Sequence, residues 1–397
     1  MKRRDLLAAL AATPLLTLGG RLYAAPQAGA KLLVVFLRGA YDATNLLVPV
    51  GSNFYYESRP NLAIARPGDN PASALALNAD WGLHPVLAKS MLPLYQTGQL
   101  AFVPFAGTDD LSRSHFETQD SVELGQALDA HRDYQSGFLN RLVSVLSGAQ
   151  AARPVAFTEQ VPLSLRGTAQ VPNIAFNTLG KGGLDARQSK VIADMYKQTA
   201  LGKQVEEGFA VKVDAQRAAA EALDAASGRA ISTKGFALEA RRIALLMKDR
   251  FDVGFVDIGG WDTHVGQGAA TGYLADRFTE LGDGLAGFGQ EMGDAWPRTV
   301  VVVISEFGRT FRENGNRGTD HGHGTVYWVL GGAIQGGRIL GEQQKLEAST
   351  LFQNRDYPVL NEYRRVFAGL FSQMYGLSAR QLDQVFAGVA PSKLGIV

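Results

Sequence analysis

Four of the six histidines in this 397-residue chain lie in short polar segments that also carry acidic side chains. The densest segment is Asp320-His321-Gly322-His323, and a second, Asp262-Thr263-His264, follows two glycines and a tryptophan. Glycine lets the backbone turn sharply enough to aim neighbouring imidazoles at one point, and a carboxylate beside them can bind a metal or orient a ring. The two segments therefore predict a divalent metal site; a flexible surface loop and a helix N-cap at Asp262 are the alternatives.

Three further carboxylates follow apolar segments and join the predicted ligands. Glu306 comes after a run of four valines and an isoleucine, so it should be partly buried and need a partner, either a metal or Arg309. Asp257 could instead hold the following glycine loop, and Asp42 could simply make a turn. The predicted metal ligands are Asp42, Asp257, Asp262, His264, Glu306, Asp320, His321 and His323. Because the chain has no cysteine and several histidines, zinc is favoured, with magnesium, manganese or calcium as alternatives.

Ser114 is the candidate nucleophile, because a helix start there would offer backbone N–H groups and a favourable dipole to a phosphoryl or sulfuryl oxyanion. Ser114 and Glu117 also have the spacing of a capping box, which explains the serine equally well. Ser112 and Thr108 are the fallback nucleophiles. Arg309 is the candidate for binding an anionic substrate through paired hydrogen bonds, and its alternative role is to neutralise a nearby carboxylate.

Strands and helices must alternate to bring these residues together. Continuous apolar runs predict strands, and spacing of apolar residues at three to four predicts helices. The expected strands are 31–38, 100–106, 251–258, 299–305 and 326–330, and the expected helices are 84–96, 114–124 and 273–292. This alternation predicts a doubly wound α/β fold with a mostly parallel sheet and helices on both faces. In such sheets ligands bind beyond the carboxyl ends of the strands, where the candidate residues fall.

Composition indicates an ordinary folded protein, with 46% hydrophobic and 19% charged residues. Lys and Arg number 39 against 38 Asp and Glu, so no broad basic field is available for nucleic acid. We expect one domain over 31–397. The alanine-rich stretch from about 185 to 226 predicts a helical insertion within it.

Residues 1–30 have the pattern of an export signal. Lys2-Arg3-Arg4-Asp5-Leu6-Leu7 is followed by an apolar run that ends near Gly19. The paired arginines favour twin-arginine export, with a Sec signal or an uncleaved anchor as alternatives. The sequence thus predicts an exported or periplasmic protein that uses the twin-arginine machinery. No stable membrane span is expected in the mature form, because the apolar run is shorter than the ~20 residues that a spanning helix needs.

Taken together, these motifs resemble an exported bacterial family of uncharacterised function in the alkaline phosphatase/sulfatase-like superfamily. The resemblance rests on the twin-arginine leader and on Phe36–Asp42, Ser114–Glu117, Gly259–His264, Ser305–Thr310 and Asp320–Gly324. It implies a doubly wound α/β fold with two metal ions at the strand ends.

The resemblance also implies roles for single residues. Asp42 matches the aspartate after the first strand, which binds one metal, and Asp262 with His264 matches the pair that holds the other. Asp257 matches a supporting acidic ligand, and His321 or His323 would supply the later histidine. Glu306 stands where many superfamily members have an Asp-His pair, so one histidine is missing there, and Ser114 matches the nucleophile by position only.

Two functions follow as expectations. The first is an exported metal-dependent hydrolase of a small anionic phosphate or sulfate ester. The second is a non-catalytic, metal-stabilised binding or assembly protein on the same fold, with a second exported protein as a possible partner. The incomplete ligand set favours the second, and the clustering of histidines at strand ends favours the first.

Overall fold

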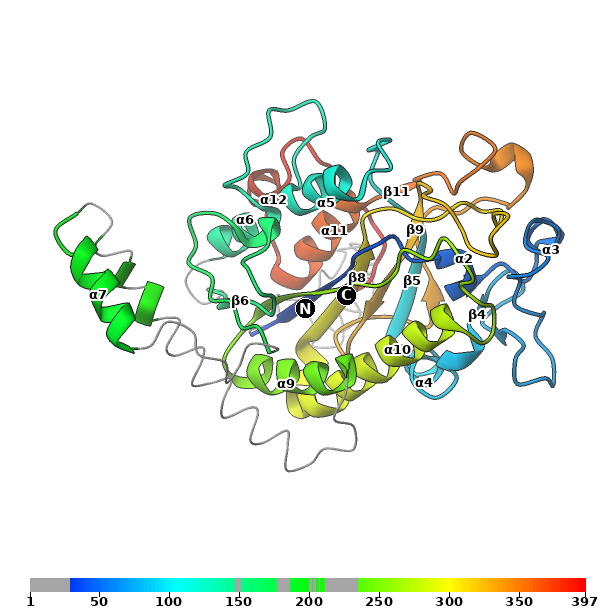
Figure 1. Ribbon diagram of the computed structural model, residues 1–397, viewed down its shortest axis with the longest axis horizontal. Coiled ribbons are helices and arrows are strands. Elements are labelled where there is room, and N and C mark those ends of the chain that lie inside the picture. Colours follow the sequence, from blue (N-terminus) through cyan, green and yellow to red (C-terminus); the bar gives the residue numbers. More distant parts are fainter. Residues whose placement is uncertain are drawn as a thin grey trace, which may run out of the picture.

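The structure is a computed structural model that describes residues 29–146, 151–176, 186–199, 202, 205–206, 208–210 and 235–397. The predicted export signal lies almost wholly outside the described residues. The predicted insertion is described mainly through helix α7 (Ala186–Tyr196), which lies to one side of the body in Figure 1.

A central sheet of eight strands forms the middle of the molecule (Figure 1). Its order is β10-β5-β9-β8-β1-β7-β6, and β11 pairs with β5. The strands are β1 (Lys31–Leu37), β5 (Leu100–Gly107), β6 (Pro154–Ala156), β7 (Val253–Ile258), β8 (Thr299–Ser305), β9 (Thr325–Leu330), β10 (Arg338–Ile339) and β11 (Asn361–Glu362). All strand pairs of this sheet are parallel except those of β9, which is antiparallel to β5 and β8. The predicted mostly parallel sheet is confirmed.

Helices cover both faces of the sheet, and each layer closes its own apolar core. The central strands β1, β8 and β9 are buried along their whole length because both faces are covered. One face carries α2 (Ala43–Leu46), α3 (Asn53–Ser58), α4 (Met91–Gln96), α9 (Phe236–Asp249) and α10 (Tyr273–Met292), with a small sheet of β2 (Leu47–Val48), β3 (Leu75–Ala76) and β4 (Gly82–Leu83). The other face carries α5 (His115–Leu124), α6 (Phe138–Val145), α11 (Tyr363–Tyr375) and α12 (Ala379–Val385). Short 3-10 turns span Pro85–Leu87, Leu163–Leu165, Gly293–Arg298 and Ala348–Thr350.

Prediction and structure differ at 84–96, where one helix was expected. The structure has a 3-10 turn at Pro85–Leu87 and a separate helix, α4. Pro93 explains the break, because proline has no N–H to donate one turn back. It is tolerated only in the first turn of a helix, which is where α4 places it.

The candidate residues gather at one edge of the sheet because β1, β5, β7 and β8 all run in the same direction. Leu37 at the end of β1 pairs with Ile258 of β7 and with Ser305 of β8, so these three strands end together. β5 runs the same way as β8, since both are antiparallel to β9. The four following loops therefore meet at this edge.

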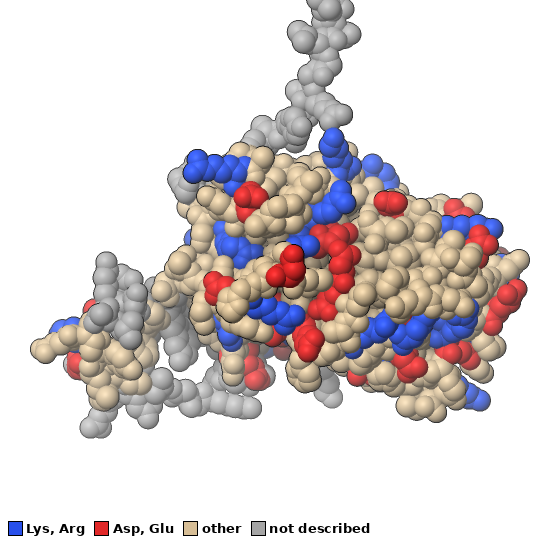
Figure 2. Space-filling view, turned by 90° about the horizontal axis from the view of Figure 1, so that it is seen from above, with Lys and Arg blue, Asp and Glu red and all other residues tan. Residues whose placement is uncertain are grey.

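The surface charge of the molecule is mixed. Figure 2 looks down on the molecule from above the view of Figure 1 and shows acidic and basic side chains interspersed, in line with the near balance of charges in the sequence. Among the described residues, no helix combines the length and the apolar character that crossing a membrane requires.

Candidate metal centre

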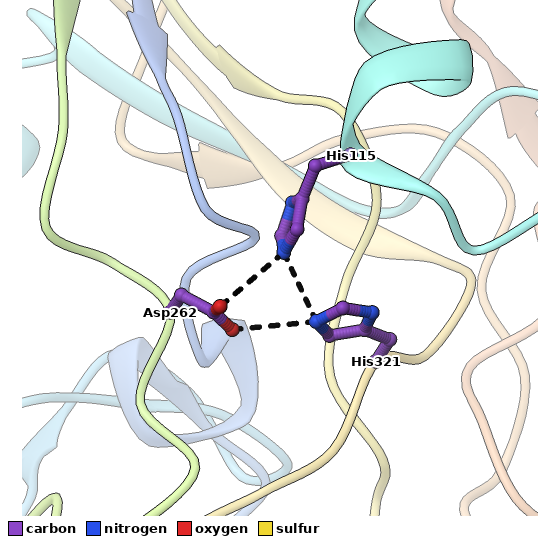
Figure 3. Close-up of side chains that lie close together, drawn as sticks. All are labelled: His115, Asp262 and His321. Carbon is purple, nitrogen blue, oxygen red and sulfur yellow. Dashed lines mark hydrogen bonds and ion pairs between the residues drawn. The ribbon is translucent and has the colours of Figure 1, made fainter.

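Three side chains, one from the start of helix α5 and two from loops, point at one another at this edge (Figure 3). They are His115, Asp262 and His321, whose nearest nitrogen and oxygen atoms all lie within 4.8 Å of one another. Nε2 of His321 lies 3.0 Å from Nε2 of His115 and 3.3 Å from Oδ1 of Asp262. Nε2 of His115 lies 3.5 Å from Oδ2 of Asp262.

His264 adds a fourth side chain to this group. Its Nε2 lies 3.1 Å from Nε2 of His321 and 2.9 Å from Oδ1 of Asp262. Ligands bound tetrahedrally to one zinc ion at about 2.0–2.1 Å are separated from each other by about 3.3 Å. The five separations above lie between 2.9 and 3.5 Å, as between ligands of one small cation. The three side chains whose ligand atoms all lie within 4.8 Å of one another are His115, Asp262 and His321, and His264 adjoins them through His321 and Asp262. We call His115, Asp262, His264 and His321 the histidine centre.

Each imidazole of the histidine centre is held through its other nitrogen. Nδ1 of His115 lies 2.7 Å from Oε1 of Glu306, and Nδ1 of His264 lies 3.2 Å from Oδ1 of Asp320. Nδ1 of His321 lies 3.0 Å from the carbonyl oxygen of Arg113. These acceptors place the proton of a neutral ring on Nδ1 and leave the lone pair of Nε2 facing inward. Lone pairs that face each other at 3.0–3.1 Å repel unless one ring carries a second proton or a metal ion lies between them, so the arrangement also suits a metal.

The backbone conformation on either side of these residues sets the direction of their side chains. His115 is the first residue of α5, and Arg113 just before it has a φ of 50°, in the left-handed region that non-glycine residues rarely adopt. Gly260, before Asp262, has a φ of 89°. At Gly39 a Cβ would lie 2.8 Å from the backbone nitrogen of Asp262, so only glycine lets the loops after β1 and β7 approach this closely.

Glu306 lies under the centre as a buried anion. Its Oε1 accepts hydrogen bonds from the backbone N–H of Gly39 at 2.8 Å and from Gln119 at 2.9 Å, besides His115. Burial works against its charge, but the hydrogen bonds from His115 and Gln119 hold the pKa of Glu306 below its usual value. The hydrogen bond to Glu306 is also the main reason that the pKa of His115 is raised.

Arg309 neutralises Asp262 from below. Its guanidinium is buried and donates to Oδ1 of Asp262, to the carbonyl of Ala40 at 2.6 Å and to the carbonyl of Thr319 at 3.2 Å. Burial opposes ionisation of Asp262, but the charge of Arg309 holds its pKa below the usual value. Of the two roles weighed for Arg309, the geometry favours charge neutralisation over substrate binding.

The other predicted ligands fall into two groups. Glu306 and Asp320 orient rings of the histidine centre. Asp42, Asp257 and His323 have other partners: Asp42 pairs with the buried Arg59, with Nη1 2.5 Å from Oδ2, and Asp257 pairs with Arg38 at 2.5 Å. The ring of His323 packs against Phe352, with centroids 4.9 Å apart, and burial lowers its pKa to about 4. Of the eight predicted ligands, Asp262, His264 and His321 belong to the histidine centre.

Ser114 occupies the N-cap position of α5 but does not cap the helix with its side chain. The capping box considered for Ser114 and Glu117 is therefore not formed. The serine is half-buried and immediately precedes His115. Of the fallback nucleophiles, Ser112 has its hydroxyl 3.1 Å from that of Thr118, and Thr108 accepts a hydrogen bond from the backbone of Asp110.

His115 was not among the predicted ligands. Its sequence context gave one usable signal: it lies in the polar loop after the 100–106 strand, like the chosen histidines after their strands. The sequence cannot show that its ring reaches Glu306 across 191 positions. In the structure, His115 lies beside Glu306.

The fold and the centre together define a mixed α/β protein with three histidines and an aspartate converging at the carboxyl ends of its strands. The family profile described as "Protein of unknown function (DUF1501)" matches residues 30–386. The chain belongs to this family. Searches of curated proteins and of solved structures gave no match.

Proposed function

We propose that this protein binds one divalent metal ion at the histidine centre and hydrolyses a small anionic ester of phosphoric or sulfuric acid. The supporting observation is the convergence of the Nε2 atoms of His115 and His321 on the carboxylate of Asp262, with His264 beside them and each ring oriented by a separate acceptor. Such oriented histidines are typical of metal sites.

The donor set favours zinc. Three imidazoles and one carboxylate suit zinc better than magnesium or calcium, which prefer oxygen ligands, and manganese is the nearest alternative. When bound, a divalent ion polarises a phosphoryl or sulfuryl oxygen and makes a nearby water more acidic. The geometry supports one ion rather than the two that the superfamily resemblance implied, because the carboxylate of Asp42 is already paired with Arg59.

Exposure supports a catalytic rather than a purely structural centre. The side chains of Asp262 and His264 are 45% and 40% exposed, whereas those of Glu306 and Arg309 beneath them are buried. Structural zinc sites have four protein ligands, whereas catalytic sites have three and keep one position open. The three side chains whose ligand atoms all lie within 4.8 Å of one another are such a set of three. Solvent reaches the histidine centre from one side, and this side would admit the ester.

Ser114 remains the proposed nucleophile, because it lies directly before His115 in the chain and its hydroxyl does not cap α5. Ser114→Ala should abolish turnover and leave the bound metal in place. Retained turnover would point to water as the attacking group.

We also propose that residues 1–30 direct export to the periplasm through the twin-arginine machinery, which cell fractionation with an Arg3→Lys, Arg4→Lys variant tests.

The experiment for the proposed function uses the purified protein loaded with zinc and a panel of p-nitrophenyl phosphate and sulfate esters. We expect metal-dependent hydrolysis of at least one ester and its loss in the His264→Ala, His321→Ala double variant. Binding of one zinc ion without hydrolysis of any ester would overturn the hydrolase and leave a metal-stabilised binding protein.

One observation favours that second candidate. Helix α7 exposes Val191 at 54% and Met195 at 71%, and it lies apart from the body in Figure 1. An exposed apolar helix face is typical of protein-binding surfaces. In that case a Val191→Ser, Met195→Ser variant should lose a second exported protein on co-purification and keep its metal.

A further inference from the structure

Two points near the end of the predicted export signal have small residues that suit its removal by a signal peptidase. One is Leu22-Tyr23-Ala24, followed by Ala25, and the other is Ala28-Gly29-Ala30, followed by Lys31. The second matches the usual pattern better, because it has alanine at both of the positions that the peptidase recognises. The sequence alone therefore leaves both Ala25 and Lys31 as candidates for the first residue of the mature chain.

The structure places the second of these points against a paired strand. The first point lies outside the described residues, whereas the second is described from Gly29 onward. Strand β1 begins at Lys31, which is already paired with Thr299 of β8. Leu32 donates its N–H to the carbonyl of Asp252 at 2.8 Å on the other side. The peptide bond before Lys31 therefore adjoins a strand that is held by a neighbour on each side.

The residues on both sides of this bond are buried. Ala30 is 7% exposed and belongs to the apolar core on the α11 side of the sheet. Lys31 is 2% exposed, and its Nζ donates to Asp252 at 3.0 Å and to the carbonyl of Phe251 at 2.9 Å. A peptidase holds several residues around the bond that it cuts, so these residues would first have to leave the sheet.

Opening β1 would disrupt the whole domain. The strand lies in the middle of the sheet, all seven of its residues are buried, and it pairs along its length with both β7 and β8. Core strands of this kind open only when the domain unfolds globally. Cleavage before Lys31 would also create a charged α-amino group on a residue whose side-chain ammonium is already buried, which is unfavourable. The second point is thus protected in the folded chain.

The export route determines whether this protection matters. The twin-arginine machinery carries proteins that have already folded, and the peptidase acts after they have crossed the membrane. A protein that crosses unfolded by the Sec route would present both points to the peptidase. The position of the cut therefore depends on whether the chain folds before or after export.

We propose that a signal peptidase cuts the folded chain between Ala24 and Ala25, so that the mature protein keeps residues 25–30 ahead of β1. Water hydrolyses the peptide bond, which leaves a carboxylate on Ala24 and a free amine on Ala25. Cleavage one residue later would place the ring nitrogen of Pro26 in the bond to be cut, and this nitrogen has no N–H. Six extended residues span about 20 Å, which separates the cut from the sheet. This inference rests on the proposed twin-arginine export.

N-terminal sequencing and intact-mass spectrometry of the protein purified from the periplasm test the processing site. We expect one N-terminus, at Ala25, and a mass that lacks residues 1–24. An N-terminus at Lys31 would overturn the inference, because it would show that the bond beside β1 is open to the peptidase.

Two matched variants test which point the peptidase recognises. Ala24→Trp and Ala28→Trp each put a bulky side chain at a recognised position of one point only. Ala24→Trp should slow processing at least about tenfold, because the peptidase requires a small residue there, and Ala28→Trp should leave the rate unchanged. Pulse labelling, with the precursor separated from the mature form by electrophoresis, measures the rate. Slow processing in Ala28→Trp, with a normal rate in Ala24→Trp, would contradict the proposed cut.

Failure of export and failure of the inference give different results. A periplasmic protein that keeps residues 1–24 would refute the processing site and leave the export proposal standing. Protein confined to the cytoplasm would contradict the export proposal instead. In that case, treatment of the purified full-length chain with signal peptidase in detergent still decides the site. Cleavage before Ala25 would support it, and cleavage before Lys31, or none, would refute it.

Discussion

Two charged clusters lie near the same ends of the strands, and different groups surround the aspartate in each of them. In the histidine centre, Asp262 meets three imidazoles whose lone pairs face inward and whose outer side is exposed. In the second, which we call the arginine cluster, Asp42 is buried against Arg59, with Gln267 donating to the same carboxylate at 2.6 Å.

The clusters also share their supporting loops. Gln267 accepts hydrogen bonds from the hydroxyls of Thr263 and Thr319, which are the neighbours of Asp262 and Asp320 in the chain. Arg59 donates to the carbonyls of Thr310 and Phe311, in the loop that follows Arg309. The arginine cluster therefore fixes the backbone on which the histidine centre is built.

The difference between the clusters shows where a metal can bind. A guanidinium packed around a carboxylate balances the negative charge without a metal ion. Neutral imidazoles carry no charge, and the lone pairs of their Nε2 atoms can bind a metal ion. Arg59 occupies the carboxylate of Asp42, which the sequence analysis had counted among the metal ligands. This contrast predicts opposite results when the two clusters are mutated.

The largest effect is expected from His321→Ala. His321 contributes the nitrogen that lies nearest to the other ligands, so its loss should lower zinc affinity at least about 1,000-fold, as expected when one of the few ligands of a zinc site is removed. Isothermal titration with zinc measures the affinity. His323→Gln, two residues along the chain, should keep the affinity of the unchanged protein; a loss of equal size would contradict the assignment of His321.

The next effect belongs to the arginine cluster. Arg59→Met leaves Asp42 as a buried charge without its partner and should lower the free energy of unfolding by about 3–5 kcal/mol. Urea unfolding measures this. The Asp42→Asn, Arg59→Met double variant should recover part of the loss and still bind one zinc ion. Loss of zinc from the folded double variant would contradict the assignment of zinc binding to the histidine centre alone.

A pH dependence is expected at His84, which lies close to the arginine cluster. Its buried ring is 3.0 Å from the carbonyl of Ala269 and packs against Phe278, and burial lowers its pKa to about 4 although the charge of Asp42 opposes this. The unfolded chain takes up a proton near pH 6.5, whereas the folded chain does so only near pH 4. Stability should therefore fall by up to about 3 kcal/mol as the pH is lowered through this window.

Urea unfolding at several pH values measures that loss, and His84→Gln is the control. Glutamine can donate to Ala269 but does not titrate, so the variant should have a flatter pH profile between 6.5 and 4. An unchanged profile would assign the acid sensitivity to another group.

The smallest effect is expected from Asp320→Asn. Asp320 orients His264 from an exposed position and does not belong to the histidine centre. Zinc affinity should fall by about tenfold, at the low end of the range for groups that orient a ligand. A fall as large as that of His321→Ala would indicate that Asp320 binds the metal directly.

The fold was largely predictable because the strands have strong local signals. The valine-rich strand β8 and helix α10 begin and end where the sequence predicted. The antiparallel direction of β9 was not predictable, because a buried strand has the same apolar pattern in either direction. The helix predicted over 84–96 is split into two elements, because Pro93 is tolerated only in the first turn of a helix and α4 therefore begins just before it.

The histidine centre was only partly predictable, for a different reason. Asp262, His264 and His321 stood out because histidine and aspartate cluster with glycine in their loops. The involvement of His115 and the pairing of Asp42 with Arg59 depend on contacts between loops. No spacing in the sequence encodes such contacts, and a buried carboxylate after a strand looks the same whether a metal or an arginine neutralises it.

The most direct test counts metal ions per chain after native export. Elemental mass spectrometry on the unchanged protein should find one ion per chain, and the His264→Ala, His321→Ala variant, still folded by circular dichroism, should contain none. Two ions per chain, or none in the folded unchanged protein, would contradict the assignment of a single ion to the histidine centre.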